Sequence, residues 1–227
     1  MSLVFKNFYI FTLLFLSVLV IDIFIKLNFG VSTYRFISKL SIPLLLCAYY
    51  IVNQKETTVK KRLFIPIGLL FFMVGDGFLI LHKIPIYYMI GIFSFIIAKL
   101  FYIFRFSNTY DFNLKRLLPF ILLCFMYMGS VLMLMIKNLN STFYIIVLLY
   151  LFIETTSLIF TILRKPAVNK LSFYLVLIGV LVSMFSASIA GLKSFYGSIA
   201  YQKITTMLFY AISQYLIIVG IVKETNK

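Results

Sequence analysis

Two ionisable residues lie inside long apolar runs of this sequence, where a charged side chain is expensive. Asp76 is enclosed by the run 71–80 and Lys99 by the run 93–103, and neither has a charged neighbour within its run. A chain that keeps an ionisable group at hydrocarbon depth normally pairs it or uses it. We therefore predict that the hairpin 63–106, with its short link at 82–85, carries the chemistry of this protein.

Asp76 is the predicted catalytic residue. Exclusion of water favours the neutral form of a carboxyl, which is the form that a general acid needs. The flanking Gly75 and Gly77 predict the close approach of another helix or of a lipid headgroup, because neither carries a side chain. The structural alternative is a protonated carboxyl that bonds to a helix backbone or to a serine.

Composition sets the class of protein that must position these groups. Hydrophobic residues make up 63% of the 227 residues, charged residues 12%, and the mean hydropathy is +1.08. Continuous apolar runs of about 20 residues predict membrane-spanning helices, and they lack the alternation of a membrane barrel. The fold class is therefore an all-α bundle of about eight transmembrane helices in one domain, 1–227, with possible four-helix halves 1–110 and 111–227. The expected spans lie near 5–25, 36–52, 63–81, 84–105, 117–137, 142–163, 171–192 and 199–222.

The net charge of +15 is explained by topology. With eight spans, 13 of the 21 basic residues fall on the side of the two termini, seven fall on the other side, and Lys99 lies within a span. Basic residues concentrate in cytoplasmic loops, so both termini are expected in the cytoplasm. No patch outside the membrane suggests nucleic acid as a partner. The abundance of Ile, Lys and Phe hints at a bacterial chain and hence at the inner membrane.

The cysteines and the histidine limit the possible chemistry. Cys47 and Cys124 fall inside predicted spans, and His82 is the one histidine. Two cysteines and one histidine in these positions predict no disulfide framework and no zinc cluster. They provide at most one member of a Ser-His-Asp triad. We expect no metal and no cofactor, and the oligomeric state stays open.

Polar residues of other spans fall into two predicted layers. At about 1.5 Å of rise per residue, Ser186 and Ser188 lie near the level of Asp76. A deeper layer, about 18–22 Å below the outer surface on the same rise, holds Lys99, Glu154 and Gln214. Lys99 and Glu154 are candidate partners, either as an ion pair that fixes helix packing or in catalysis. Asp22, near the end of its span, is expected to be solvated or to snorkel.

Three segments give the sequence a resemblance to a known family. The segments 72–81, which contains Gly75-Asp76-Gly77, 91–102, which ends at Tyr102, and 209–217, which contains Gln214, resemble the YhhN-like membrane family, which includes the lysoplasmalogenases. The likeness covers nearly all eight spans. It implies an eight-helix membrane hydrolase that cleaves the vinyl ether bond of lysoplasmalogen. The products would be a fatty aldehyde and glycerophospho-ethanolamine or glycerophospho-choline, and the substrate a membrane lysophospholipid.

The resemblance implies that Asp76 donates the proton, with support from Lys99, Glu154, Gln214, Ser186, Ser188 and Tyr102. Two positions depart from the family pattern. Ala187 stands between two serines where the family usually has aspartate, and Lys99 stands where histidine is common. The missing aspartate leaves open a member that has lost catalysis and binds a lipid or a partner. The buried charges and the possible repeated halves leave open a small transporter.

Overall fold

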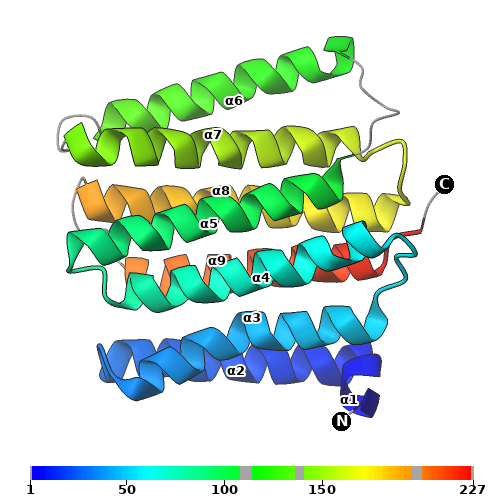
Figure 1. Ribbon diagram of the computed structural model, residues 1–227, viewed down its shortest axis with the longest axis horizontal. Coiled ribbons are helices and arrows are strands. Elements are labelled where there is room, and N and C mark those ends of the chain that lie inside the picture. Colours follow the sequence, from blue (N-terminus) through cyan, green and yellow to red (C-terminus); the bar gives the residue numbers. More distant parts are fainter. Residues whose placement is uncertain (1, 108–113, 136–140, 196–200, 226–227) are drawn as a thin grey trace. The chain divides into compact units, whose positions relative to one another are not determined.

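In the computed structural model every described element is a helix (Figure 1). The structure describes residues 2–107, 114–135, 141–195 and 201–225. One short helix precedes eight long ones: α1 (Ser2–Lys6), α2 (Phe8–Asn28), α3 (Thr33–Asn53), α4 (Val59–Ile80), α5 (Pro85–Phe106), α6 (Leu114–Met135), α7 (Ser141–Leu163), α8 (Lys170–Phe195) and α9 (Gln202–Val222).

The eight long helices confirm the predicted number of spans. Among the described residues, eight helices are long and apolar enough to cross a membrane. The first begins three residues later than predicted, because Asn7 ends α1 and caps α2. Its Oδ1 accepts hydrogen bonds from the backbone N–H groups of Tyr9 and Ile10, which otherwise lack partners in the first helical turn.

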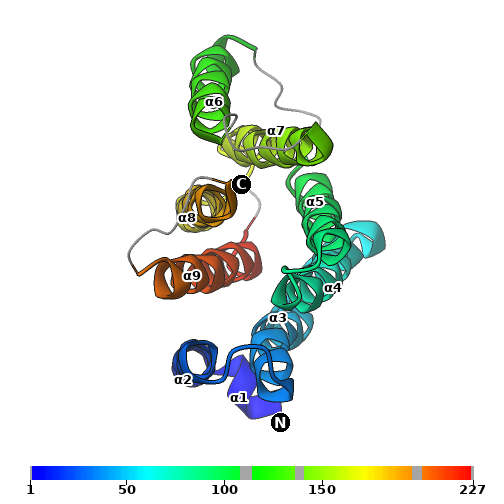
Figure 2. The same cartoon turned by 90° about the vertical axis from the view of Figure 1, so that its left-hand side faces the viewer.

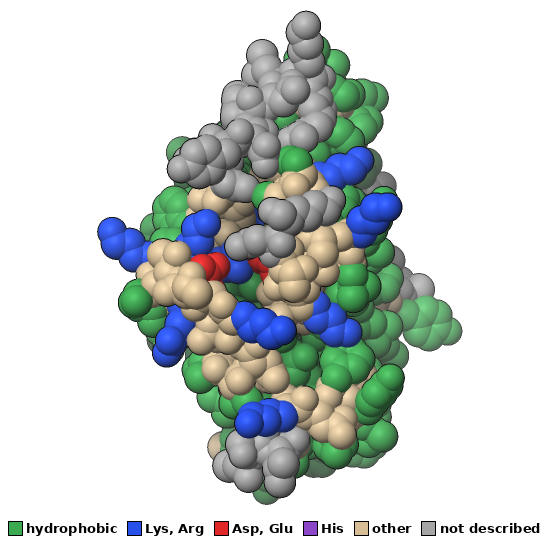
Figure 3. Space-filling model, turned by 90° about the vertical axis from the view of Figure 1, so that its right-hand side faces the viewer, with side chains coloured by type: hydrophobic (Ala, Val, Ile, Leu, Met, Phe, Trp, Pro, Cys, Tyr) green, Lys and Arg blue, Asp and Glu red, His purple; other side chains and the backbone are tan. Residues whose placement is uncertain are grey.

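Apolar side chains cover much of the outer surface of these helices. On α6, Phe125, Met126 and Met133 are mostly exposed, with Met133 at 79%. Such a surface is unfavourable in water and suits the hydrocarbon of a bilayer. Figure 3, which looks onto helix ends, shows Lys and Arg side chains among tan and green atoms, with little acidic surface. The protein is an integral, multi-pass membrane protein.

The described residues form two compact units, Met1–Phe101 and Tyr102–Lys227. The boundary falls inside α5, near the middle of the chain. The predicted halves, 1–110 and 111–227, stay a prediction.

In the first unit, α3 lies between α2 and α4 (Figures 1 and 2). Helices α4 and α5 approach closely at two glycines. A Cβ atom added at Gly75 would lie 2.5 Å from the Phe95 ring and 3.0 Å from the carbonyl oxygen of Gly91. The absence of both side chains is what lets these backbones approach. Gly75 therefore fixes the position of Asp76, the next residue.

In the second unit, α8 and α9 form the most extensive helix pair among the described residues. A Cβ at Gly179 would lie 2.8 Å from Ile217, and one at Gly220 would lie 2.7 Å from Val176. Small residues on both helices therefore permit close packing, as is common where helices associate in lipid.

Pro43 lies in the interior of α3. The helix begins at Thr33, because Ser32 caps it by accepting a hydrogen bond from the Arg35 N–H. Pro43 has no N–H to donate to the carbonyl of Lys39, four residues earlier. The backbone carbonyl of Lys39, the residue that pairs with Asp76, therefore lacks its usual helical hydrogen bond.

Candidate functional site

Asp76 is buried and forms an ion pair with Lys39. The residue is 1% exposed, and Lys39 Nζ lies 3.0 Å from its Oδ1 and 3.4 Å from its backbone oxygen. The expected burial is observed, and the carboxyl is paired with a residue outside its own run. Lys39 supplies a charge from α3, 37 residues earlier in the chain, so the sequence around Asp76 gave no sign of it.

Asp22 forms a second buried ion pair in the same unit. Its Oδ1 accepts hydrogen bonds from Arg35 Nη1 and, at 2.7 Å, from Ser38 Oγ. Asp22 is 0% exposed, so the expectation that it is solvated or snorkels is wrong. Its Oδ2 is buried without a hydrogen-bond partner among the described residues.

Helix α3 supplies the charged partners of both carboxyl groups. Arg35, Ser38 and Lys39 follow the spacing i, i+3, i+4, which places them on neighbouring positions of one helix surface. Arg35 and Ser38 bind Asp22 of α2, whereas Lys39 binds Asp76 of α4. This spacing is the signal by which the sequence could have revealed the pairs. Instead, the predicted topology counts Arg35 and Lys39 among the seven basic residues on the side opposite the termini.

The two glycines beside Asp76 give a matched test of the α4–α5 contact. We expect Gly75→Ala to lower the free energy of unfolding by about 1–3 kcal/mol, because the new methyl overpacks against Phe95. The methyl group that Gly77→Ala adds has no atom within 4 Å. This variant is expected to stabilise α4 by up to about 1 kcal/mol. Unfolding titrations in mixed micelles measure both variants. Equal losses at the two positions would contradict the assigned packing.

Three predicted supporting residues have polar partners in the second unit. Tyr102, at the end of α5, donates its hydroxyl to Gln214 Oε1 of α9 at 2.8 Å, so the structure brings these two together. Glu154 of α7 accepts from Tyr150 at 3.2 Å and from Ser183 of α8 at 3.4 Å through Oε1. Glu154 is 0% exposed, and these hydroxyl groups offset part of the cost of burying it.

The two serines around Ala187 have different partners. Ser188 Oγ lies 2.7 Å from the Tyr127 hydroxyl of α6. Ser186 donates to the backbone oxygen of Thr206 in α9 at 2.9 Å. Both serines therefore connect α8 to neighbouring helices of its own unit. Their predicted shared level with Asp76 stays a prediction.

Lys99 is buried at the end of the first unit. Its predicted partner Glu154 belongs to the second unit. The pairing of these two residues therefore stays a prediction.

The first unit thus contains two buried carboxyl groups, each paired with a cation of α3. The pair of Asp76 with Lys39 can exchange a proton away from water. In comparison with known proteins, the model of the YhhN family matches residues 34–221. The match spans α3 to α9 and includes Asp76 and Lys39, whereas Asp22 precedes it. No curated protein and no solved structure was found to match the chain.

Proposed function

The chain belongs to the YhhN family, and on that premise we propose that it is a lysoplasmalogenase-like hydrolase of the membrane. Its substrate would be a lysophospholipid with a vinyl ether bond, and its products a fatty aldehyde and glycerophospho-ethanolamine or glycerophospho-choline. The proposal includes the predicted orientation, with both termini in the cytoplasm of a bacterial inner membrane.

The observation that carries this proposal is the buried pair of Asp76 and Lys39. Lys39 Nζ lies 3.0 Å from Asp76 Oδ1, which is close enough for a proton to pass from the ammonium to the carboxylate. Away from water, the transfer of this proton within the pair neutralises both charges, so the pair can present a carboxylic acid. General acid catalysis needs such a donor within hydrogen-bond reach of the substrate.

The proposed reaction begins with proton transfer from Asp76 to the β-carbon of the vinyl ether. The double bond is consumed in forming the new C–H bond, and the ether oxygen donates electrons to give an oxocarbenium ion. The Asp76 carboxylate left behind stabilises this cation. Water then adds to the carbon that bears the oxygen, and its released proton returns to the pair of Asp76 and Lys39. In the collapse of the hemiacetal its hydroxyl loses a proton as the carbonyl forms, the C–O bond to the glycerol breaks, and the glycerol oxygen takes up a proton, which releases the aldehyde and the glycerophospho product.

Asp22 supports the proposal as a second carboxylate. The family resemblance implies a second aspartate at the position that Ala187 occupies in this chain. The Oδ1 of Asp22 is held by Arg35 and Ser38, and its Oδ2 has no protein hydrogen-bond partner among the described residues. That oxygen can accept a hydrogen bond from the attacking water. Lys39 acts as a positioning residue and proton store for Asp76.

Ala187 also favours a second candidate function. If the reaction requires a carboxylate at that position, this chain would bind a lysophospholipid without cleaving it. Such a member would keep the apolar surface and the buried pairs and would lack turnover. The two candidates therefore differ in aldehyde release and agree in lipid binding.

The test is aldehyde release by the purified chain in detergent. We expect aldehyde from a lysoplasmalogen and none from the saturated alkyl ether analogue, because a single C–C bond cannot accept the proton. The reaction should be slower in D₂O, and the α-carbon of the aldehyde should carry one deuterium. Retention of lysoplasmalogen without aldehyde would overturn the hydrolase proposal and establish the binding function.

A further inference from the structure

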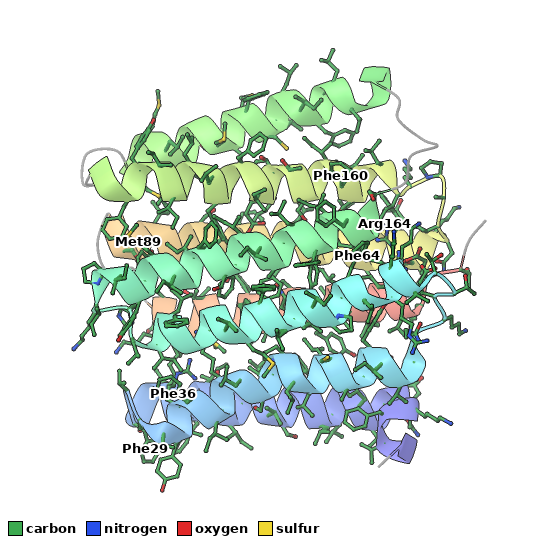
Figure 4. The ribbon with its side chains drawn as sticks, viewed as in Figure 1. Phe29, Phe36, Phe64, Met89, Phe160 and Arg164 are labelled. Atoms are coloured by element: carbon green, nitrogen blue, oxygen red, sulfur yellow. The ribbon has the colours of Figure 1, made fainter. Side chains whose placement is uncertain are left out.

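Two arginines and one glutamate form a buried cluster at one end of the second unit. Arg105 Nη2, from the last turn of α5, lies 3.0 Å from Glu224 Oε2, and Arg164 Nη2, just after α7, lies 2.9 Å from the same oxygen. Figure 4 labels Arg164 at that end of α7. The functional proposal above does not use this cluster, which we call the two-arginine cluster.

Arg164 is the most buried member of the two-arginine cluster. It is 2% exposed, its Nη2 also donates to Ser172 Oγ at 3.2 Å, and its guanidinium lies 5.2 Å from the centre of the Phe106 ring. Its Nη1 is buried and has no hydrogen-bond partner among the described residues. A buried guanidinium nitrogen without an acceptor is costly. The cluster therefore offers unused donors to a ligand.

The charges of the two-arginine cluster do not balance. One carboxylate faces two guanidinium groups, and a single oxygen of that carboxylate serves both. The pKa of Arg164 is lowered to about 10: desolvation and the neighbouring Arg105 lower it, and together they outweigh Glu224, which raises it. The positive end of the α8 dipole lies nearby, since α8 begins at Lys170 and Ser172 is in its first turn. Each of these features favours an additional anion.

We propose that the two-arginine cluster is a binding site for a phosphate group, which takes the place of the Glu224 carboxylate. Guanidinium groups bind phosphate oxygens through paired hydrogen bonds. A tetrahedral phosphate offers more oxygens than the single Oε2 in use, so it can also accept from Arg164 Nη1. The cluster lies at the end of spanning helices, where lipid headgroups lie and where basic pockets bind them.

Glu224 is placed so that it can leave without unfolding the end of α9. The neighbouring backbone is held separately, because Asn169 N–H donates to the Thr225 oxygen at 3.1 Å and the Asn169 side chain donates to the Lys223 oxygen at 3.2 Å. The Glu224 side chain is itself partly exposed, at 13%. The carboxylate is therefore a replaceable occupant of the cluster.

The test uses the full chain in maltoside micelles, which contain no phosphate. One arm adds inorganic phosphate and the other adds phosphatidylglycerol, and each follows the thermal unfolding midpoint and ligand retention in native mass spectrometry. We expect the Glu224→Gln variant to bind inorganic phosphate or phosphatidylglycerol at least about tenfold more tightly than the unsubstituted chain does. This factor corresponds to about 1.4 kcal/mol. Arg164→Gln should lose binding, and Lys165→Gln, an exposed neighbour, should leave it unchanged.

A response to inorganic phosphate supports a site for free phosphate, and a response to the lipid alone supports a headgroup site. The proposal is overturned if neither ligand binds, or if Lys165→Gln reduces binding as much as Arg164→Gln does. If Arg164→Gln does not fold, the Glu224→Gln variant decides the question. An affinity of this variant no higher than that of the unsubstituted chain means that Glu224 does not occupy a phosphate position, and it overturns the proposal.

Discussion

Asp76→Asn is expected to reduce aldehyde release from lysoplasmalogen by about 10²–10⁴-fold, the usual contribution of a general acid. The amide is nearly the same size as the carboxyl but cannot take the proton of Lys39 and pass it to carbon. It can still accept a hydrogen bond from Lys39 Nζ, which lies 3.0 Å from Asp76 Oδ1. Aldehyde trapping under saturating substrate measures the turnover.

The matched control for this variant is Glu56→Gln, the same change of carboxyl to amide in the connection between α3 and α4. We expect this control to retain the turnover of the unsubstituted chain. A folded Asp76→Asn protein that keeps its turnover would exclude Asp76 as the proton donor. Equal losses in both variants would indicate a general effect of charge.

Arg35→Met is expected to destabilise the first unit by about 3–5 kcal/mol, because it leaves the Asp22 carboxylate buried without its cation. Ser38 would then be the sole hydrogen-bond donor to Asp22 among those described, and one neutral donor does not replace a guanidinium. Unfolding titrations in mixed micelles measure this loss. Lys83→Met, which removes an exposed basic residue of the same unit, should change stability by less than about 0.5 kcal/mol.

The double variant Asp22→Leu/Arg35→Met separates folding from catalysis. Removal of both charges should recover most of the stability, because an apolar pair in place of a buried ion pair is often neutral or stabilising. The proposed role of Asp22 requires this folded protein to be impaired in turnover. A stable and fully active double variant would limit Asp22 to a structural role, and no recovery of stability would contradict the assigned pair.

The sequence alone predicted the helical architecture, because a chain that crosses a bilayer must satisfy its backbone within each segment. Apolar runs of sufficient length therefore indicated the eight spans, and each predicted span overlaps one long helix. The errors lie at the helix ends, where capping by Asn7 and Ser32 sets the first residue. The Asn7 cap sets the start of α2, and the Ser32 cap starts α3 at Thr33, before the predicted start near residue 36.

The sequence also predicted that Asp76 is kept from water, because its neighbours on both sides are apolar. It did not predict the partner of Asp76, because Lys39 is 37 residues away and only the packing of α3 beside α4 brings the two together. The same reason applies to Arg35 with Asp22, and to the two arginines that share Glu224. A loop count treats each basic residue as a surface charge, whereas helix packing decides which of them enter the interior and which acid they meet.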